Sequence, residues 1–241
     1  ARFDEEANIN WAEMLESIGA QVVYGVVGLK THAKMMLITR REGRSLKRYG
    51  HLSTGNYNPR TAKLYTDISH LTADTAITTD MEHVFVHLAS QSKLPRLAKL
   101  WMAPFQLQRN LVSRIDALGR AAAQGQSVRI VAKMNALTDE ELIQSLLKAG
   151  AQGVKIDLIV RGACMLPARV PGYTDNIRVR SVIGRFLEHS RVFYFRQAEV
   201  EDLYLCSADW MNRNMVRRVE LAWPVTDPTL RQRIVDECLV A

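Results

Sequence analysis

The chain is poor in cysteine, has no long apolar run and lacks a glycine-rich P-loop. Its three cysteines are odd in number and have no metal-ligand spacing, which excludes a disulfide framework and predicts reduced thiols in a cytoplasmic protein. No apolar stretch approaches the ~18 residues that a transmembrane helix needs. The motif G-x-x-x-x-G-K-S/T is missing, so any bound nucleotide is held in another way.

The charge balance favours anionic partners. The 241 residues include 32 Lys and Arg against 25 Asp and Glu, which gives a formal net charge of +7. Such an excess is typical of proteins that bind nucleotides, polyanions, nucleic acids or acidic membrane surfaces. The length is sufficient for a well-buried core, arranged as one large domain or two small ones.

The chain contains two copies of a histidine followed two positions later by a cation. These residues are His32 with Lys34 and His189 with Arg191. A run of hydroxyl, small, Asn or Asp, and aromatic residues follows each copy, as TGNYNPRT at 54–61 and SADWMNRN at 207–214. Two such half-sites folded against each other would present histidines, cations and amide donors, a set that suits a phosphoryl group better than a neutral substrate.

The similarity between the copies extends well beyond these motifs. Downstream the matched positions lie 153 residues apart, so that Asp67 corresponds to Glu220. Upstream the separation is 131, and residues 19–21 are identical to residues 150–152. The change in separation indicates an insertion in the second copy between about 160 and 188. A period of this length predicts a duplicated domain rather than a solenoid.

Each copy is expected to fold as strand, helix, strand, loop and strand. Apolar residues with helical spacing occur at Trp11, Leu15 and Ile18 and again at Leu142, Leu146 and Ala149. Apolar runs at 22–27 and 154–160 predict strands buried on both faces. Further strands are predicted directly after the histidines, at 35–38 and 192–195, and a longer helix at 107–122. This alternation predicts an α/β fold.

The predicted organisation has a first half at 1–88, a connecting helical segment at 89–126 and a second half at 127–241. The second half begins with a predicted strand at 128–133, for which the first half offers only residues 1–3. We therefore expect the first half to be truncated at its N-terminus and the chain to be a fragment of a longer protein.

The two histidines are the candidate catalytic residues. A histidine attacks phosphorus when one ring nitrogen is unprotonated and a partner on the other nitrogen aims it. The matched carboxylates are expected to be these orienting partners, with Asp67 holding Nδ1 of His32 and Glu220 holding Nδ1 of His189. One histidine would be the nucleophile and the other an acid or base. The expected phosphate-binding residues are Lys34, Asn56 and Arg191.

Several strings resemble one known family. The paired histidine motifs resemble the phospholipase D superfamily, although Thr39 and Arg196 stand where that superfamily usually has an aspartate. The strings ARFDEEANI, GLKTHAK, TGNYN, TAKLYTD, IVRGAC, DNIR, LEHSR and SADWMNRN resemble the C-terminal catalytic half of bacterial polyphosphate kinases. Ser53 departs from the glycine usual in that family. The resemblance implies duplicated phospholipase D-like α/β units with mixed sheets flanked by helices and the active site between the two halves.

The resemblance also implies roles for individual residues. His32 matches the histidine that becomes phosphorylated, and His189 matches a second essential histidine that contacts nucleotide. Tyr65 and Arg161 match ATP-binding positions. Arg2 matches an arginine of the phosphate and magnesium region; because a guanidinium has no acceptor, we expect it to bind the phosphates that hold Mg²⁺.

The implied activity is reversible ATP:polyphosphate phosphotransfer through a phosphohistidine. ATP or ADP and inorganic polyphosphate would be the partners and Mg²⁺ the cofactor, with no nucleic acid expected. The resemblance further implies a homo-oligomer in the full-length protein and leaves peripheral membrane association open. Two alternatives remain: a phospholipase D-type phosphodiesterase or nuclease, and a non-catalytic polyanion-binding fragment with steep salt dependence. The fragment alone is expected to bind polyphosphate more readily than it turns over ATP.

Overall fold

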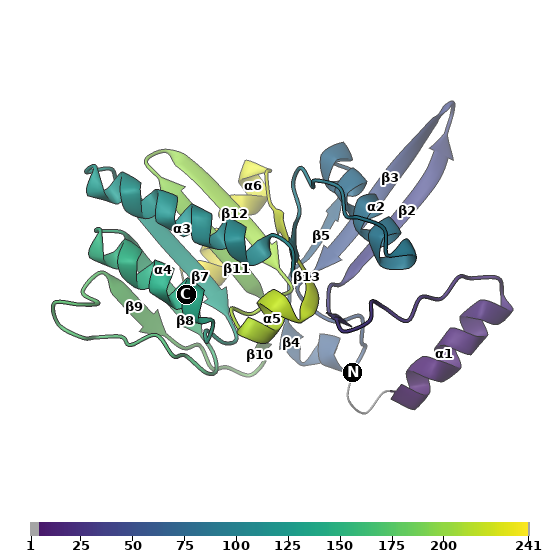
Figure 1. Cartoon of the computed structure of the whole chain (residues 1–241), viewed down its shortest axis with the longest axis horizontal. Helices are drawn as coiled ribbons and strands as arrows, with labels where there is room; N and C mark the ends of the chain where they lie inside the picture. The colour runs from purple at the N-terminus through teal and green to yellow at the C-terminus, as the bar shows by residue number, and fades with distance from the viewer. Residues whose placement is uncertain (1–4, 241) are drawn as a thin grey trace.

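The computed structural model describes residues 5–240, which form a mixed α/β fold (Figure 1). The predicted α/β class is thereby confirmed. The elements of the first half are α1 (Glu5–Ser17), β1 (Lys30–Thr31), β2 (Met35–Glu42), β3 (Ser45–Ser53), η1 (Thr61–Lys63), β4 (Tyr65–Thr66), β5 (Ser69–Thr72) and α2 (Thr75–Ser90). The elements that follow are β6 (Trp101–Ala103), α3 (Leu107–Ala123), β7 (Val128–Met134), α4 (Glu140–Ala151), β8 (Lys155–Val160), β9 (Ile177–Arg180), β10 (Leu187–Glu188), β11 (Arg191–Gln197), β12 (Val200–Cys206), α5 (Asn212–Val216), β13 (Arg218–Pro224), α6 (Pro228–Ile234) and η2 (Val235–Leu239).

An eight-stranded mixed sheet forms the centre of the molecule. Its strands follow the order β1-β13-β12-β11-β7-β8-β9, and β6 also pairs with β13. The strands β7, β8 and β9 run parallel to one another, whereas β11 runs antiparallel to both β7 and β12. Two smaller sheets complete the fold: antiparallel β2-β3-β5 and the parallel pair β10-β4.

Both faces of the central sheet are buried because successive side chains point to opposite faces. In β7, Ile130 and Ala132 belong to one hydrophobic core and Val131 to the other. The helices α3 and α4 cover the first core and lie in front of the sheet in Figure 1. On the other face, Ile77 and Met81 of α2 join the second core. The first half therefore packs directly on the sheet of the second.

The helix predicted at 107–122 is confirmed as α3. Its core-facing residues, spaced three or four apart, are Leu107, Leu111, Ile115 and Leu118, and all are fully buried. The chain then turns at Gly125, whose φ is +82°, a conformation that favours glycine. The next helix, α4, starts at Asp139, whose side chain accepts the N–H of Leu142.

Two short pairs of parallel strands join the halves. β1 of the first half pairs with β13 of the second, and β10 of the second half pairs with β4 of the first. The backbone N–H of His32 continues the first pairing by donating to the Val219 carbonyl at 2.9 Å, and that of His189 continues the other by donating to Thr66 at 3.2 Å. Each strand that leads into a histidine thus lies beside a strand of the opposite half.

The predicted strand at 22–27 is wrong. The segment is irregular apart from one isolated bridge between Val26 and Leu29. Its counterpart in the second half, β8, is hydrogen-bonded to β7. The strand expected in the place of β7 falls on residues 1–3, which lie outside the described part of the chain. Residues 22–27 therefore have no neighbouring strand among the residues described.

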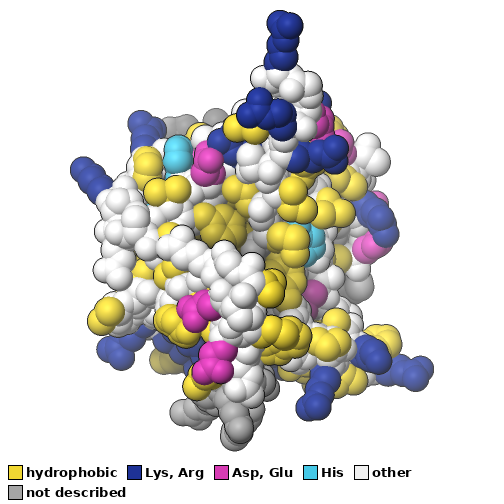
Figure 2. Space-filling view, turned by 90° about the vertical axis from the view of Figure 1, so that its right-hand side faces the viewer, with side chains coloured by type: hydrophobic (Ala, Val, Ile, Leu, Met, Phe, Trp, Pro, Cys, Tyr) yellow, Lys and Arg dark blue, Asp and Glu magenta, His cyan; other side chains and the backbone are white. Residues whose placement is uncertain are grey.

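The helix predicted around Trp11 is confirmed as α1, but its apolar face is exposed. Trp11 is 60% and Ile18 75% exposed, whereas their counterparts Leu142 and Ala149 in α4 are buried. Figure 2 views the molecule from the side on which Figure 1 places α1 and α2, and hydrophobic side chains gather there between basic ones. Apolar patches of this kind are typical of surfaces that pack against other protein.

Asp80 offers a test of what holds α2 to the chain that follows it. Its buried carboxylate accepts three backbone N–H groups, those of Ala98, Lys99 and Leu100, at 3.0, 2.6 and 2.9 Å. We expect Asp80→Ala to lower the free energy of unfolding by about 2–5 kcal/mol, because it leaves these donors unpaired. The control Glu82→Ala removes only a partly exposed ion pair with Arg48 and should cost about 1 kcal/mol or less. Equal costs in urea denaturation would contradict this role of Asp80.

Candidate active site

The two histidines lie where the halves meet, each directly after a short strand. His32 follows β1 and His189 follows β10. Both cations, Lys34 and Arg191, are more than nine-tenths buried beside them. Arg191 reaches across to the first half, where its guanidinium donates to the Thr54 carbonyl at 3.3 Å. The fold thus gathers the paired motifs into one site.

His32 is held between a carboxylate and an ammonium group. Its Nδ1 lies 2.9 Å from both oxygens of Glu220, and its Nε2 lies 3.0 Å from Nζ of Lys34. An ammonium group can only donate, so Nε2 is the acceptor and the ring proton sits on Nδ1. Burial lowers the pKa of His32 below its ordinary value even though Glu220 acts in the opposite direction. The ring is therefore neutral at neutral pH, with an unprotonated Nε2.

His189 has a similar arrangement. Its Nδ1 lies 2.8 Å from Oδ1 of Asp67, and burial lowers its pKa below the ordinary value. Nη1 of Arg191 lies 3.2 Å from each of the two ring nitrogens, whereas Lys34 contacts only Nε2 of His32. The ring of Tyr65 packs on the imidazole with centroids 4.8 Å apart.

The expected pairing of histidines with carboxylates is wrong in one respect. Comparison of the two copies predicts His32 beside Asp67 and His189 beside Glu220, each within its own half. The structure pairs His32 with Glu220 and His189 with Asp67. The cause lies in the strand pairing: β1 runs beside β13, which carries Glu220, and β10 runs beside β4, which precedes Asp67.

A hydroxyl group supports each carboxylate in the same way. Thr54 donates to Asp67 at 2.7 Å, and Ser207 donates to Glu220 at 2.5 Å. Each hydroxyl also accepts the backbone N–H of the residue after the carboxylate, at 3.0 and 3.1 Å. Asn214 gives Glu220 a further bond at 2.6 Å. This role of the matched hydroxyls is not among the sequence-based predictions; their presence in both copies is the signal that points to it.

The loop after β3 packs tightly against Asp67. A Cβ atom on Gly55 would lie 2.1 Å from Oδ2 of Asp67, so this position requires glycine. Ser53, which stands where a glycine is usual, accepts the N–H of Gly55 at 3.0 Å through its hydroxyl. The departure therefore adds a contact to the loop and leaves the carboxylate in place.

The two cations differ in their surroundings. Burial lowers the pKa of Lys34 to about 8. Arg191 instead forms two hydrogen bonds to the carboxylate of Asp209, both at 3.1 Å. Asn56 occupies the position that matches Asp209; it is exposed, and within residues 5–240 its side chain has no hydrogen bond. Its expected role in phosphate binding stays a prediction.

Tyr65 and Arg161 line a common cleft of about 560 Å³ together with Phe186. Arg161 is fixed there by hydrogen bonds from Nε to the Asn135 side chain at 3.1 Å and to the Glu188 carbonyl at 2.9 Å. Since Tyr65 contacts His189, this cleft adjoins the histidine pair. Arg2, the remaining predicted phosphate-binding residue, lies outside the described residues.

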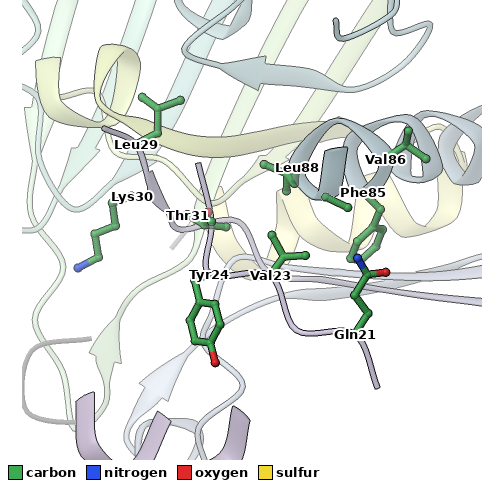
Figure 3. Close-up of a pocket in the computed structure, with 11 residues that line it drawn as sticks. Gln21, Val23, Tyr24, Leu29, Lys30, Thr31, Phe85, Val86 and Leu88 are labelled. Carbon is green, nitrogen blue, oxygen red and sulfur yellow. The ribbon is translucent and has the colours of Figure 1, made fainter. Parts of the chain in front are cut away.

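A larger cleft, of about 810 Å³, lies between the segment at 21–31 and α2 (Figure 3). Tyr24, Leu29 and Phe85 are among its largely apolar lining side chains. Neither histidine lines it, and its only lining side chain with a formal charge is Lys30. The chemistry of the chain is therefore concentrated at the smaller cleft and the histidine pair.

The described residues offer no preformed metal site. No group of three or more His, Cys, Asp or Glu side chains in that part of the chain is arranged to hold a metal ion. The nearest carboxylates, Asp67, Asp209 and Glu220, already bind histidine or arginine. In the same described part, no helix is long and apolar enough to cross a membrane.

Family models match almost the whole chain. Residues 1–94 match "Polyphosphate kinase C-terminal domain 1", and residues 100–239 match "Polyphosphate kinase C-terminal domain 2". The boundary between the two matched regions lies at residues 95–99. The predicted division of the chain into two halves and a separate connecting segment at 89–126 stays a prediction.

Individual relatives agree with these matches. A polyphosphate kinase of Burkholderia cenocepacia is 54% identical over 99% of this chain, which covers 35% of that protein. The crystal structure of a polyphosphate kinase from Porphyromonas gingivalis superposes with a TM-score of 0.88 at 37% identity, over 98% of this chain and 36% of that one. A yeast tyrosyl-DNA phosphodiesterase H432N mutant shares only the fold, with a TM-score of 0.52 at 9% identity, over 82% of this chain and 68% of that one. The chain thus spans about a third of the length of the curated relatives it matches.

The crossed pairing of carboxylates and histidines can be tested by titration. Each carboxylate raises the pKa of the imidazole it contacts. We therefore expect Glu220→Gln to lower the pKa of His32 and leave that of His189 unchanged, and Asp67→Asn to do the reverse. Nuclear magnetic resonance of the ring protons measures both values. The control Asp157→Asn, which removes a carboxylate bound to Arg129 and Arg178, should move neither. The opposite assignment of the two shifts would contradict the crossed pairing.

Proposed function

The chain belongs to the polyphosphate kinase family, and from that premise we propose that it forms the phosphoryl-transfer site of an ATP:polyphosphate phosphotransferase. The observation that carries the proposal is the pair of half-buried neutral histidines, each aimed by a carboxylate at Nδ1. The unprotonated Nε2 of His32 beside Lys34 is a nucleophile next to a cation that can bind the oxygens of its target.

In the first proposed step, His32 attacks the γ-phosphorus of ATP in line with the leaving group. The lone pair of Nε2 forms the N–P bond, and the electrons of the bond between γ-phosphorus and the bridging oxygen leave with ADP. Nδ1–H continues to donate to Glu220, which stabilises the positive charge that the ring acquires. Lys34 moves its hydrogen bond from Nε2 to the incoming phosphoryl oxygens, freeing the lone pair as the substrate arrives.

In the second step, an oxygen of the terminal phosphate of polyphosphate attacks the phosphohistidine, and the N–P bond breaks to return His32 to its neutral form. We assign His189 the role of donating or accepting a proton on the opposite side of phosphorus. The same atoms in reverse order make ATP from polyphosphate. Phosphoryl transfer depends chiefly on position and charge, which is what the two cations supply.

We assign the nucleotide to the cleft beside His189. Tyr65 offers an aromatic face there, and Arg161 offers a guanidinium for the phosphates. Mg²⁺ is expected in this family. The carboxylates beside the histidines, Asp67, Asp209 and Glu220, already bind histidine or arginine, and within the described residues they form no site for a metal ion. Homo-oligomerisation and peripheral membrane association stay predictions from the family.

The decisive test is covalent labelling. In the full-length protein, incubation with γ-labelled ATP should give an acid-labile, base-stable label, and His32→Ala should abolish it because the nucleophile is gone. The control His87→Ala, which removes a ring bonded to Ser92 at the end of α2, should keep the label. Unlabelled wild-type protein that nevertheless cleaves a phosphodiester would indicate a hydrolase instead. Protein that binds polyphosphate with no label would indicate a binding module.

The rate of labelling should depend on pH, with one limb set by the lowered pKa of His32 and the other by the lowered pKa of Lys34. Below the pKa of His32, which burial lowers from its ordinary value, the ring is protonated and cannot attack, so the rate rises with pH through that pKa. Lys34 has a pKa of about 8 and loses its charge above it, so the rate then falls. In Lys34→Arg, whose guanidinium stays protonated, the alkaline fall should move to higher pH. The control Lys148→Arg should leave the profile unchanged, and a wild-type rate still rising at pH 9 would exclude a charged Lys34 as a requirement.

A further inference from the structure

The two half-sites share one pattern of hydrogen bonds. The hydroxyls of Thr54 and Ser207 each donate to a carboxylate, and the backbone N–H of each donates to a carbonyl, that of Ile68 at 3.1 Å and that of Leu221 at 3.0 Å. Since the hydroxyl positions are equivalent, the residues two positions later are equivalent as well. Those residues are Asn56 and Asp209. They are the point at which the two half-sites differ in charge.

The carboxylate of Asp209 binds Arg191, the cation of its own half. It binds Arg191 through both oxygens and accepts the backbone N–H of Asn135 at 2.8 Å, with only 8% of the residue exposed. Burial acts to raise its pKa, but the charge of Arg191 outweighs this and holds the pKa below its ordinary value. Asp209 is therefore an anion at neutral pH.

The electrostatic consequence is an unequal site. The charges that act on Lys34, beside His32, are those of the carboxylates Glu220 and Asp67 and of the cations Arg191 and Arg218. Beside His189, Asp209 binds Arg191 through two hydrogen bonds, in addition to Asp67 on the imidazole. A phosphoryl group brings several negatively charged oxygens, so at the second histidine it meets the anion Asp209, where the matching residue of the first half-site is the neutral Asn56.

We propose that the Asn56/Asp209 difference selects His32 rather than His189 as the phosphorylated histidine. Asp209 is a positioning residue: it anchors Arg191 as a fixed clamp and cancels its charge. Asn56 adds no negative charge to the half-site of Lys34, and its amide adds a donor where Asp209 has only acceptors. The inference rests on the proposed function, since it explains which of two similar imidazoles receives the phosphoryl group.

The exchange of these two residues provides the experiment, performed in the full-length protein with γ-labelled ATP and peptide mapping of the label. Asn56→Asp introduces a carboxylate at the position of the first half-site that matches Asp209 in the second. We expect it to slow labelling of His32 by about 10-fold or more and to move the alkaline limb of the pH profile upward, because a new anion stabilises protonated Lys34. Asn56 is exposed, so the melting temperature should not change.

A matched variant separates charge from the loss of the amide. Asn56→Ser removes the amide without adding charge, and it should slow labelling less than Asn56→Asp and leave the alkaline limb where it was. The double exchange Asn56→Asp with Asp209→Asn should move a substantial share of the label to the peptide that contains His189.

The outcomes are distinct. Labelling of Asn56→Asp at the wild-type rate, or a double exchange that still labels only His32 at the wild-type rate, would overturn the inference. An alkaline limb that shifts equally in Asn56→Ser would also overturn it, because the effect would then not be one of charge. Wild-type protein that takes no label at all would instead refute the proposed function and leave no selection between histidines to explain.

Discussion

The crossed hydrogen bonds between histidines and carboxylates are the constraint on which the site depends. His32 of the first half binds Glu220 of the second, and His189 of the second binds Asp67 of the first. Neither half can orient its own imidazole, so a functional histidine exists only when β1 lies beside β13 and β10 beside β4. The two pairings fix the relative position of the halves and of the catalytic nitrogen atoms together. Any rotation of one half against the other would disturb both histidines at once.

Keeping this many ionisable groups out of water requires that nearly all their bonding capacity be used. Glu220 is fully buried, and its oxygens accept bonds from an imidazole, a hydroxyl and an amide. A buried carboxylate without such donors would be strongly destabilising. The same burial lowers the pKa of both histidines and of Lys34. The desolvation that makes the site costly to build therefore also keeps His32 neutral near neutral pH, which its proposed role as nucleophile requires.

The secondary-structure elements and the chemical groups of the site could be predicted from the sequence more fully than their arrangement in space. The α/β class, the helix at 107–122 and the motif residues follow from periodicity and from comparison of the two copies. The partner of each histidine did not, because alignment of the copies pairs His32 with Asp67 as readily as with Glu220. Only the parallel strand pairs that cross between the halves decide it. The strand predicted at 22–27 failed for a related reason: an apolar run becomes a strand only beside another strand, and local sequence does not specify the neighbour.

A duplicated scaffold has a particular difficulty, since symmetry offers the phosphoryl group two equivalent acceptors whereas an ordered reaction needs one. The two half-sites have the same chain of hydroxyl, carboxylate and imidazole, which orients each histidine. They differ in the cations and in the residues beside the cations. Lysine and arginine are not interchangeable here: a lysine ammonium can shift its pKa and change partner, whereas an arginine bound through two bonds stays where it is. A division between a lysine charge beside the proposed nucleophile and a fixed arginine charge beside the second histidine needs no change of fold. It needs only side-chain differences on an otherwise repeated framework, which is how two copies of one unit can come to perform two different parts of the same reaction.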